Sequence, residues 1–395
     1  MPAFFTQSLK QQDFSAIPTL QSLEPRRMLA ASTNSYTEQD LTSDGSLGTP
    51  HVDTHLLNPW GMVVTAHGIQ IANSDSGTST AYDAGGDTLG STITVPGNPT
   101  GIVQNPSATS FLINGTTAAN FIFATETGKI EAVGAAGGTT TVVSDQSNKP
   151  NVFKGLAVAA FKHNEFLYAA NFTGNTINVF NSSFALTHVP GRFVDPNLPA
   201  GYGPFNVQNI NGQLYVQYAR HLHGTIEPGV GVGTGIVDVF GSDGNFVKRL
   251  AAGGKLDAPW GIAQAPATGF GAFSGDILVG NFGNGQINAF NPTTNKFDGT
   301  LANSSKQAIS IDGLWGIEFG NGKAGTLPSA LYFAAGIEGY NGGLYGRLLA
   351  NAAVAATPPP SQNPTPPTSP SFPYSAPMSA TFSDSPLDQL LNDAM

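Results

Sequence analysis

The sequence predicts an all-β protein folded as a six-bladed β-propeller. Two observations carry this prediction, a composition that suits short strands and tight turns, and a phrase that recurs six times. The 395 residues include 48 glycines, 28 prolines and 25 phenylalanines, and only 11% are charged. Glycine and proline are unfavourable inside helices, whereas aromatic and β-branched residues suit strands joined by turns. A hydrophobic fraction of 40% is enough for a sizeable core.

The recurring phrase is usually a proline, a large residue and a glycine, followed by an apolar strand. We call the glycine position the anchor. The six anchors are Gly61, Gly101, Gly155, Asn206, Gly261 and Gly316. They are spaced 40, 54, 51, 55 and 55 residues apart, and a four-stranded blade takes about 40–50 residues. The repeats therefore predict six blades.

Each repeat continues with further strands. A second strand is clear at 165–171, and a third follows at 174–180, where apolar residues alternate as in a half-buried strand. The sixth repeat lacks a fourth strand. We expect residues 36–41 to supply it by pairing with the strand that ends near Leu348, because this closure removes exposed sheet edges.

The chain divides into four predicted segments: an export leader at 1–35, the propeller at 36–352, a proline-rich linker at 353–378 and a short amphipathic tail at 379–395. The linker composition favours an extended spacer. The tail places leucines at helical spacing, which suits either docking on a partner or a frayed terminal turn.

Charge and composition narrow the partners. The net charge is −10 and no basic cluster occurs, so nucleic acid is a poor partner. There is no cysteine, hence no disulfide and no thiolate nucleophile. No stretch has the roughly 20 apolar residues of a spanning helix. We expect a monomer that binds a protein, a glycan or a small molecule.

Two resemblances bear on the source and fold. The octapeptide LEPRRMLA at 23–30 resembles the LEPR-XLL motif found near the N-termini of exported planctomycete and other bacterial proteins. It implies export to the cell surface, the periplasm or the medium. The phrase AANFTGNTINVF at 169–180 looks like an NHL-type repeat.

Longer phrases, including LLNPWGMV at 56–63 and APWGIAQAP at 258–266, resemble an uncharacterised bacterial family often associated with the PEP-CTERM sorting signal. That family implies a six-bladed, NHL-like propeller and export, and no established activity. This chain lacks the apolar helix and basic end of a PEP-CTERM tail.

In NHL-like blades, the loop before the innermost strand and the turn after the second strand open on one face. We therefore expect aromatic and polar side chains to surround a channel mouth there. The ligand-binding candidates are Trp60, Phe205, Trp260, Trp315, Asn73 and Tyr218, with Phe153 as a further aromatic. An aromatic rim with a few polar groups is typical of a small-molecule or sugar site. The alternative is structural, with aromatic residues between blades and asparagines capping turns.

A metal site is the sharper hypothesis. Gluconolactonase-like propellers hold a divalent cation in the channel with Glu, Asn and Asp, and Glu126, Asn171 and Asn281 are of the right type for Ca2+. Asp75 or Glu318 would complete the set. His221 and His223 point the same way on a strand and suit either a metal or a solvated loop.

Two functions follow. The first is an exported, non-catalytic binding or scaffold module. The alternative is a divalent-metal-dependent hydrolase or lactonase of gluconolactonase-like type with its site in the central channel.

Overall fold

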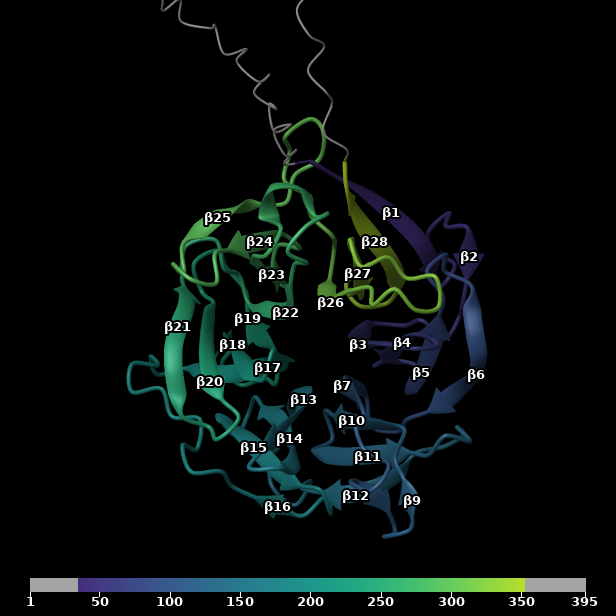
Figure 1. Cartoon of the computed structure of the whole chain (residues 1–395), viewed down its shortest axis with the longest axis vertical. Helices are drawn as coiled ribbons and strands as arrows, with labels where there is room; N and C mark the ends of the chain where they lie inside the picture. Colours follow the sequence, from purple (N-terminus) through teal and green to yellow (C-terminus); the bar gives the residue numbers. More distant parts are fainter. Residues whose placement is uncertain (1–34, 352–395) are drawn as a thin grey trace, which may run out of the picture. The chain divides into compact units, whose positions relative to one another are not determined.

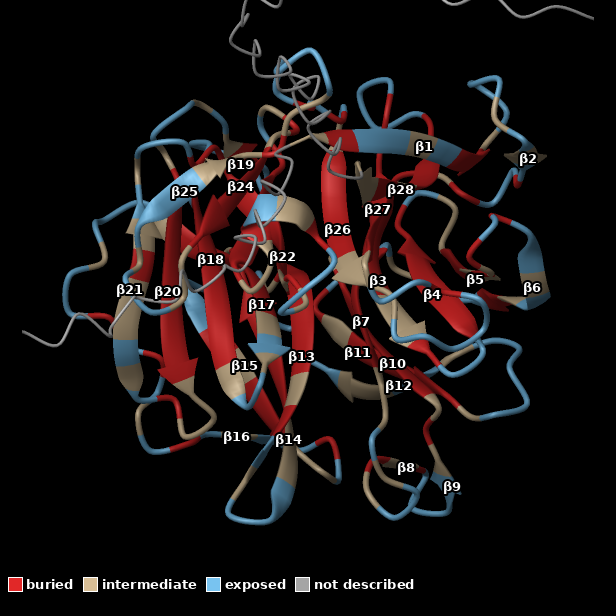
Figure 2. Ribbon diagram, turned by 45° about the horizontal axis from the view of Figure 1, so that its top comes forward, coloured by how far each residue is buried: buried red, intermediate tan, exposed pale blue. Residues whose placement is uncertain are grey.

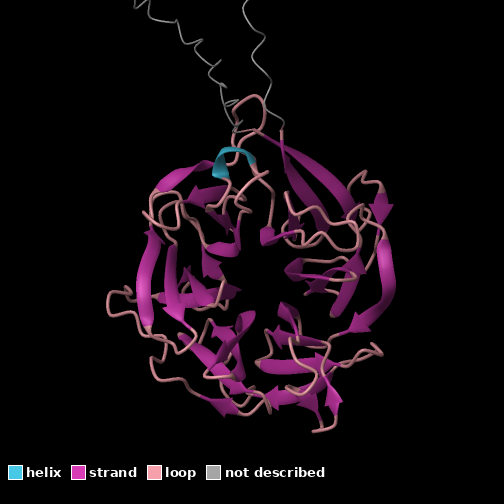
Figure 3. Ribbon diagram, in the orientation of Figure 1, coloured by secondary structure: helices cyan, strands magenta, loops and turns pink. Residues whose placement is uncertain are grey.

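The protein is described by a computed structural model that covers residues 35–351, which form a closed ring of six blades around a central axis (Figure 1). Within this part of the chain, every regular element is a strand except one 3-10 turn, η1 (Gly271–Phe273) (Figure 3). The prediction of an all-β, six-bladed propeller is confirmed. None of the described residues belongs to a helix long and apolar enough to cross a membrane.

The first three blades are built in chain order, each from the axis outward. Blade 1 contains β3 (Pro59–Thr65), β4 (Gly68–Asn73), β5 (Thr78–Tyr82) and β6 (Thr88–Thr94). Blade 2 contains β7 (Pro99–Gln104), β10 (Phe121–Thr125), β11 (Lys129–Val133) and β12 (Thr141–Asp145), with the small hairpin β8 (Leu112–Ile113) and β9 (Thr117–Ala118) inserted. Blade 3 contains β13 (Phe153–Phe161), β14 (Asn164–Asn171), β15 (Thr176–Asn181) and β16 (Leu186–Thr187).

The last three blades follow the same plan. Blade 4 contains β17 (Tyr202–Ile210), β18 (Gln213–His221), β20 (Ile236–Gly241) and β21 (Phe246–Ala252), with β19 (Pro228–Gly229) paired to β18. Blade 5 contains β22 (Pro259–Gln264), β23 (Ile277–Asn281), β24 (Ile287–Phe290) and β25 (Phe297–Thr300). Blade 6 contains β26 (Leu314–Phe319), β27 (Ala330–Ala335), β28 (Leu344–Ala350) and β1 (Tyr36–Ser43), and β2 (His51–Val52) lies outside β1.

The ring closes where the sequence predicts. Strand β1 pairs antiparallel with β28, from Tyr36 opposite Ala350 to Ser43 opposite Leu344. The Tyr36 side chain is buried, and its hydroxyl donates a hydrogen bond of 3.1 Å to the Phe270 carbonyl of blade 5. The N-terminal strand therefore completes blade 6 and also fastens it to its neighbour.

The core lies between the blades. Each of the six blade–blade interfaces buries its own apolar cluster, and a seventh, aromatic cluster lies on the axis. Strands such as β4 and β18 are buried over most of their length (Figure 2). Between blades 6 and 1, for example, Tyr345 stacks on Tyr82 with ring centroids 5.1 Å apart. Burial of this kind stabilises the ring at roughly 25 cal/mol per Å² of apolar surface.

The anchor glycines bring the innermost strands together around the axis. A Cβ atom on Gly101 would lie 2.3 Å from the Leu156 nitrogen, and one on Gly261 would lie 2.4 Å from the Trp315 carbonyl oxygen. Blade 4 has Asn206 instead, whose amide donates a 2.8 Å hydrogen bond to the Trp260 carbonyl. Glycine is favoured at the other five anchors because neighbouring backbones touch at this level, which we call the waist.

The channel has two different ends. Each innermost strand starts at what we call the plug end and runs to the open end. At the plug end, the turn after a second strand bonds to the loop before the innermost strand, as in Ser74 N–H to Asn58 O (3.1 Å) and Phe282 N–H to Ala258 O (3.1 Å). The expectation that these two kinds of loop share one face therefore agrees with the geometry.

Candidate functional site

The predicted aromatic rim does assemble, but as a plug rather than as an open mouth. Trp60, Trp260, Trp315 and Phe205 pack on one another and are each 3% exposed or less. Trp60 stacks on Trp315 with ring centroids 3.5 Å apart, and Trp260 meets both rings edge-on at 6.0 and 5.8 Å. Because these side chains cover one another, a ligand would reach them only if the plug opened.

The stack continues outward to the surface. Trp315 stacks on Phe282 at 4.1 Å, and Phe282 stacks on Tyr340 at 5.5 Å. The indole N–H groups of Trp260 and Trp315 donate to Lys154 O (2.9 Å) and Asn58 Oδ1 (3.0 Å). The buried Trp60 N–H has no hydrogen-bond partner among the described residues.

A buried lysine occupies the plug at the position where four of the other five repeats carry an aromatic residue. The Lys154 side chain is 0% exposed, and its ammonium group forms an ion pair with Glu126 and lies 3.9 Å from Glu227. The same ammonium lies 4.9 Å from the Trp60 ring centroid, a cation–π contact. Sequence reasoning missed this lysine, although alignment on the anchors places it in register with the tryptophans.

Asn73 and Tyr218, the polar residues predicted to line the channel mouth, are buried within or between the blades. The Asn73 amide is buried and donates to the hydroxyls of Thr78 (3.2 Å) and Thr80 (2.9 Å) in its own blade. Tyr218 is buried between blades 3 and 4, where burial raises the pKa of its phenol. Phe153 is buried between blades 2 and 3, so it does not belong to the rim.

The residues predicted to bind Ca2+ are occupied by protein groups. The amide oxygen of Asn171 accepts a hydrogen bond from Gly174 N–H (3.0 Å), and that of Asn281 accepts one from Asp257 N–H (3.1 Å). The Glu126 carboxylate is paired with Lys154. Asn171 thus caps the turn after its strand, the structural alternative, and Asn281 fastens the loop before β22. Ca2+ binding stays a prediction for experiment.

Asp75 and Glu318, the two acidic residues predicted to complete the metal site, lie at opposite ends of the channel. Asp75 is near Glu126, whose charge adds to burial in raising the Asp75 pKa, against a hydrogen bond from Asn58. Glu318 lines the open end, beyond the waist. In the part of the chain that the structure describes, no three His, Asp or Glu side chains are grouped as a metal site.

The two histidines also have separate surroundings. The His221 ring nitrogen lies 2.6 Å from Asn175 Oδ1, and the ring packs on Phe172 at 4.3 Å. Burial lowers the His221 pKa. His223 is exposed in the following loop.

The waist separates the two ends of the channel. Between the anchors remains a space of about 20 Å³, lined by Gly61, Gly101, Asn206 and their neighbours. Such a space has room for about one water molecule. A ligand larger than water therefore enters from the open end.

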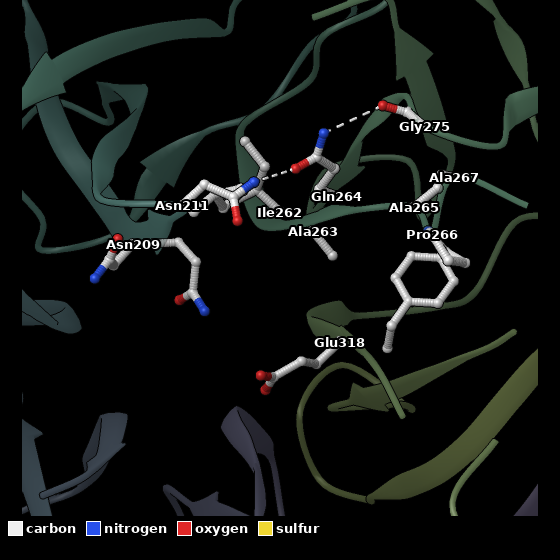
Figure 4. A pocket seen from close by; sticks show the side chains of 13 residues that line it. Asn209, Asn211, Ile262, Ala263, Gln264, Ala265, Pro266, Ala267, Gly275 and Glu318 are labelled. Atoms are coloured by element: carbon white, nitrogen blue, oxygen red, sulfur yellow. Dashed lines mark hydrogen bonds between the residues drawn. The ribbon is translucent and has the colours of Figure 1, made fainter. Parts of the chain in front are cut away.

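The open end holds two cavities of about 530 and 190 Å³, which share Gln208, Asn209 and Glu318 among their lining residues. Figure 4 shows the Glu318 carboxyl group pointing into the larger cavity, across open space from Asn209 and Asn211. The Asn211 amide donates to Gln264 Oε1 at 2.5 Å, and the Gln264 amide donates to the Gly275 carbonyl at 3.3 Å. The Gln208 amide makes no side-chain hydrogen bond with any described residue and is free to bind a ligand.

Glu318 is the ionisable side chain of this site. Burial in the channel raises its pKa from 4.5 to about 8, against a hydrogen bond with the Val64 backbone. At neutral pH the carboxyl is therefore mostly protonated and can donate a hydrogen bond as well as accept one. A perturbed carboxyl in a concave site is a common mark of function.

A sequence signal for this site exists. Two positions after each anchor, four of the repeats carry a small or branched apolar residue, namely Val63, Val103, Ala157 and Ala263. The other two carry Gln208 and Glu318. Polar side chains at an apolar repeat position indicate a local role, and comparison of the repeats would have found both.

This chain is similar over most of its length to two proteins that are named as uncharacterized. No protein-family model matches it. Uncharacterized protein R648 of Acanthamoeba polyphaga mimivirus is 32% identical over 354 residues, covering 85% of each chain. Uncharacterized protein L690 of the same virus is 30% identical over 359 residues, covering 85% of this chain and 91% of L690. The chain belongs to the R648 family.

This membership corrects the expected source. The chain was predicted to belong to a bacterial PEP-CTERM-associated family, and that prediction is wrong, because the R648 family relatives that span 85% of the chain are mimivirus proteins. The phrases behind the resemblance belong to the propeller repeat itself. The LEPR-like residues 23–30, the linker at 353–378 and the tail at 379–395 lie outside the described residues, and export stays a prediction.

Two solved structures with a fold similar to this chain are dehydrogenases by name. The soluble aldose sugar dehydrogenase of Escherichia coli covers 80% of this chain over its full length, with a TM-score of 0.50 and 12% identity. A glucose dehydrogenase gives a TM-score of 0.50 with 13% identity, covering 80% of this chain and 99% of its own. At these identities the likeness establishes the fold alone.

Proposed function

We propose that this protein is a binding module whose open-end channel holds a small, uncharged, hydroxylated molecule. The observation that carries the proposal is the cavity of about 530 Å³ lined by Gln208, Asn209, Gln264 and Glu318. Its volume lies in the usual range for small-molecule sites, roughly 300–1,000 Å³. Amide groups and a protonated carboxyl provide both donors and acceptors, which is the chemistry that hydroxyl groups need.

The charge of the cavity supports a neutral ligand. Glu318 is the one ionisable residue among the described residues that line the two open-end cavities. With its pKa near 8, it carries little charge at neutral pH. An ionic ligand would lose its hydration without gaining a partner of opposite charge, and such burial is unfavourable.

The experiment measures binding of neutral sugars to the full chain by titration calorimetry at pH 6.5. Glucose and other neutral aldoses are the first probes, because two proteins of similar fold are named as dehydrogenases of such sugars. We expect Gln208→Ala and Glu318→Ala each to weaken binding by about ten-fold, the equivalent of about 1.4 kcal/mol for a lost hydrogen bond. Gln307→Ala removes an exposed glutamine that lines neither cavity and serves as the matched control.

Two results would contradict the proposal. One is the absence of binding for every neutral sugar at 10 mM. The other is sugar binding that Gln208→Ala and Glu318→Ala alter no more than Gln307→Ala does, which would move the site away from the channel.

A further inference from the structure

A second cavity, in blade 3, differs from the channel in charge. It is a groove of about 610 Å³ bounded by the loop after β12, the β14–β15 turn and the loop after β16, around β15 and β16 in Figure 1. Lys149, His188 and Arg192 line it, and none of its 17 lining residues is an Asp or Glu. The chain as a whole has a net charge of −10. Another cavity is also lined by two cations and no carboxylate, Arg249 and Lys255, but there Arg249 is paired with Asp195 and Asp238.

Neither cation is neutralised by its surroundings. The Lys149 and Arg192 side chains form no ion pair or hydrogen bond with any residue between 35 and 351. At physiological ionic strength, charges beyond about 8 Å are largely screened. Among the lining residues, the positive charge of Lys149 and Arg192 is therefore not balanced by any carboxylate.

The backbone on either side of Arg192 is held in place by hydrogen bonds to the next blade. Arg192 and Phe193 both have left-handed backbone conformations, with φ of 54° and 55°, which are unfavourable for residues with a Cβ atom. Hydrogen bonds from Gly191 N–H to Asp243 O (2.8 Å) and from Phe193 N–H to Gly244 O (3.0 Å) maintain this conformation.

The Phe193 ring is the anchor of this segment. It is buried between blades 3 and 4, where it packs on Tyr168 at 5.6 Å and on Phe240 at 5.3 Å. The blade interface thus fixes the backbone on which Arg192 is carried.

The loop that carries Lys149 is fixed as well. The Asn171 amide donates to Asn151 Oδ1 (2.7 Å), and the Asn151 amide donates to the Gln146 carbonyl (2.8 Å). Asn171, predicted as a metal ligand, therefore shapes one wall of this groove. The backbones that carry Lys149 and Arg192 are thus ordered before a ligand binds, so that binding has to order only the two exposed side chains.

We propose that this groove binds a small organic anion, with a carboxylate or phosphate group between Lys149 and Arg192 and an apolar part against Ile177 and Leu186. The guanidinium group matches the planar oxygen pairs of such anions, and the ammonium adds a second charge. Leu186 is 50% exposed, which leaves apolar surface for the remainder of the ligand to cover. This site is separate from the channel and does not depend on its proposed ligand.

The test uses benzoate and phenyl phosphate as anionic probes and benzamide as the uncharged isostere of benzoate. Binding to the full chain is followed by ligand-detected NMR titration at 20 mM and 150 mM salt. We expect benzoate to bind at least ten-fold more tightly than benzamide, with weaker binding at the higher salt. The stronger of the two anionic probes assigns the head group.

Substitutions of the two cations test whether the anion binds in this groove. Lys149→Ala and Arg192→Ala should each weaken benzoate binding about five- to ten-fold, and Arg192→Lys should weaken it less. Lys323→Ala removes an exposed cation of blade 6 and should leave binding unchanged. Melting temperatures of all variants verify that the ring remains folded. The proposal is overturned if benzoate and benzamide bind equally, if neither anion binds at 10 mM, or if the groove variants behave like Lys323→Ala.

Discussion

Replacing Glu318 with glutamine should change the pH dependence of stability in a defined direction. Burial raises the pKa of this carboxyl from 4.5 to about 8. Between these values the folded chain retains a proton that the unfolded chain has released, so the free energy of unfolding falls as pH rises. At about 1.4 kcal/mol per pH unit, the loss is on the order of 5 kcal/mol for complete burial. Because Glu318 is half-buried and lines an open cavity, we expect about 2–4 kcal/mol.

Urea unfolding of wild type and Glu318→Gln, followed by tryptophan fluorescence at pH 5, 6, 7 and 8, measures the effect. The difference between the two chains is the relevant quantity, because burial also raises the pKa values of Asp238 and Asp276 to about 6 and both remain in the variant. We expect similar stability at pH 5 and a variant more stable by about 2–4 kcal/mol at pH 8. Glu338→Gln, at an exposed position, is the control and should follow wild type.

Parallel stability curves for wild type and Glu318→Gln would refute this reasoning. They would mean that Glu318 is ionised in the folded protein at neutral pH. The same result would remove the carboxyl donor from the channel site, so the neutral-ligand proposal would then depend on the amides alone.

Three further outcomes are expected. Gly101→Ala should lower the free energy of unfolding, measured by urea titration, by more than about 2 kcal/mol, because the new Cβ would meet the Leu156 nitrogen at 2.3 Å. The control is Gly48→Ala, which has open space around it and should leave that free energy nearly unchanged. Trp315→Ala should cost about 3–5 kcal/mol, because it removes the buried ring at the centre of the plug; an unchanged midpoint would contradict the packing. Millimolar Ca2+ should not shift the melting temperature, because Lys154 occupies the predicted carboxylate ligand; a clear shift that Glu126→Gln abolishes would restore the metal-site hypothesis.

The aromatic residues show how far repeat analysis reaches. Their register on Gly61, Gly261 and Gly316 predicts that Trp60, Trp260 and Trp315 meet around one axis, and they do. Whether three indoles form an open rim or a closed plug depends on their side-chain rotamers and on Lys154 beneath them. Those features arise only after the ring has closed.

The sequence by itself determined the number of blades, their order and the seam, because each follows from local periodicity and from a strand missing at one end and present at the other. It also carried the polar exceptions Gln208 and Glu318 in the repeat register. Only the tertiary structure decided which side chains face a cavity and which are already hydrogen-bonded to other protein groups. The hydrogen bonds of Asn171 and Asn281 are examples of the second kind. The physical reason is that burial, pairing and pKa depend on contacts between blades, such as Arg192 held by the turn of the following blade, and these contacts join residues far apart in the chain.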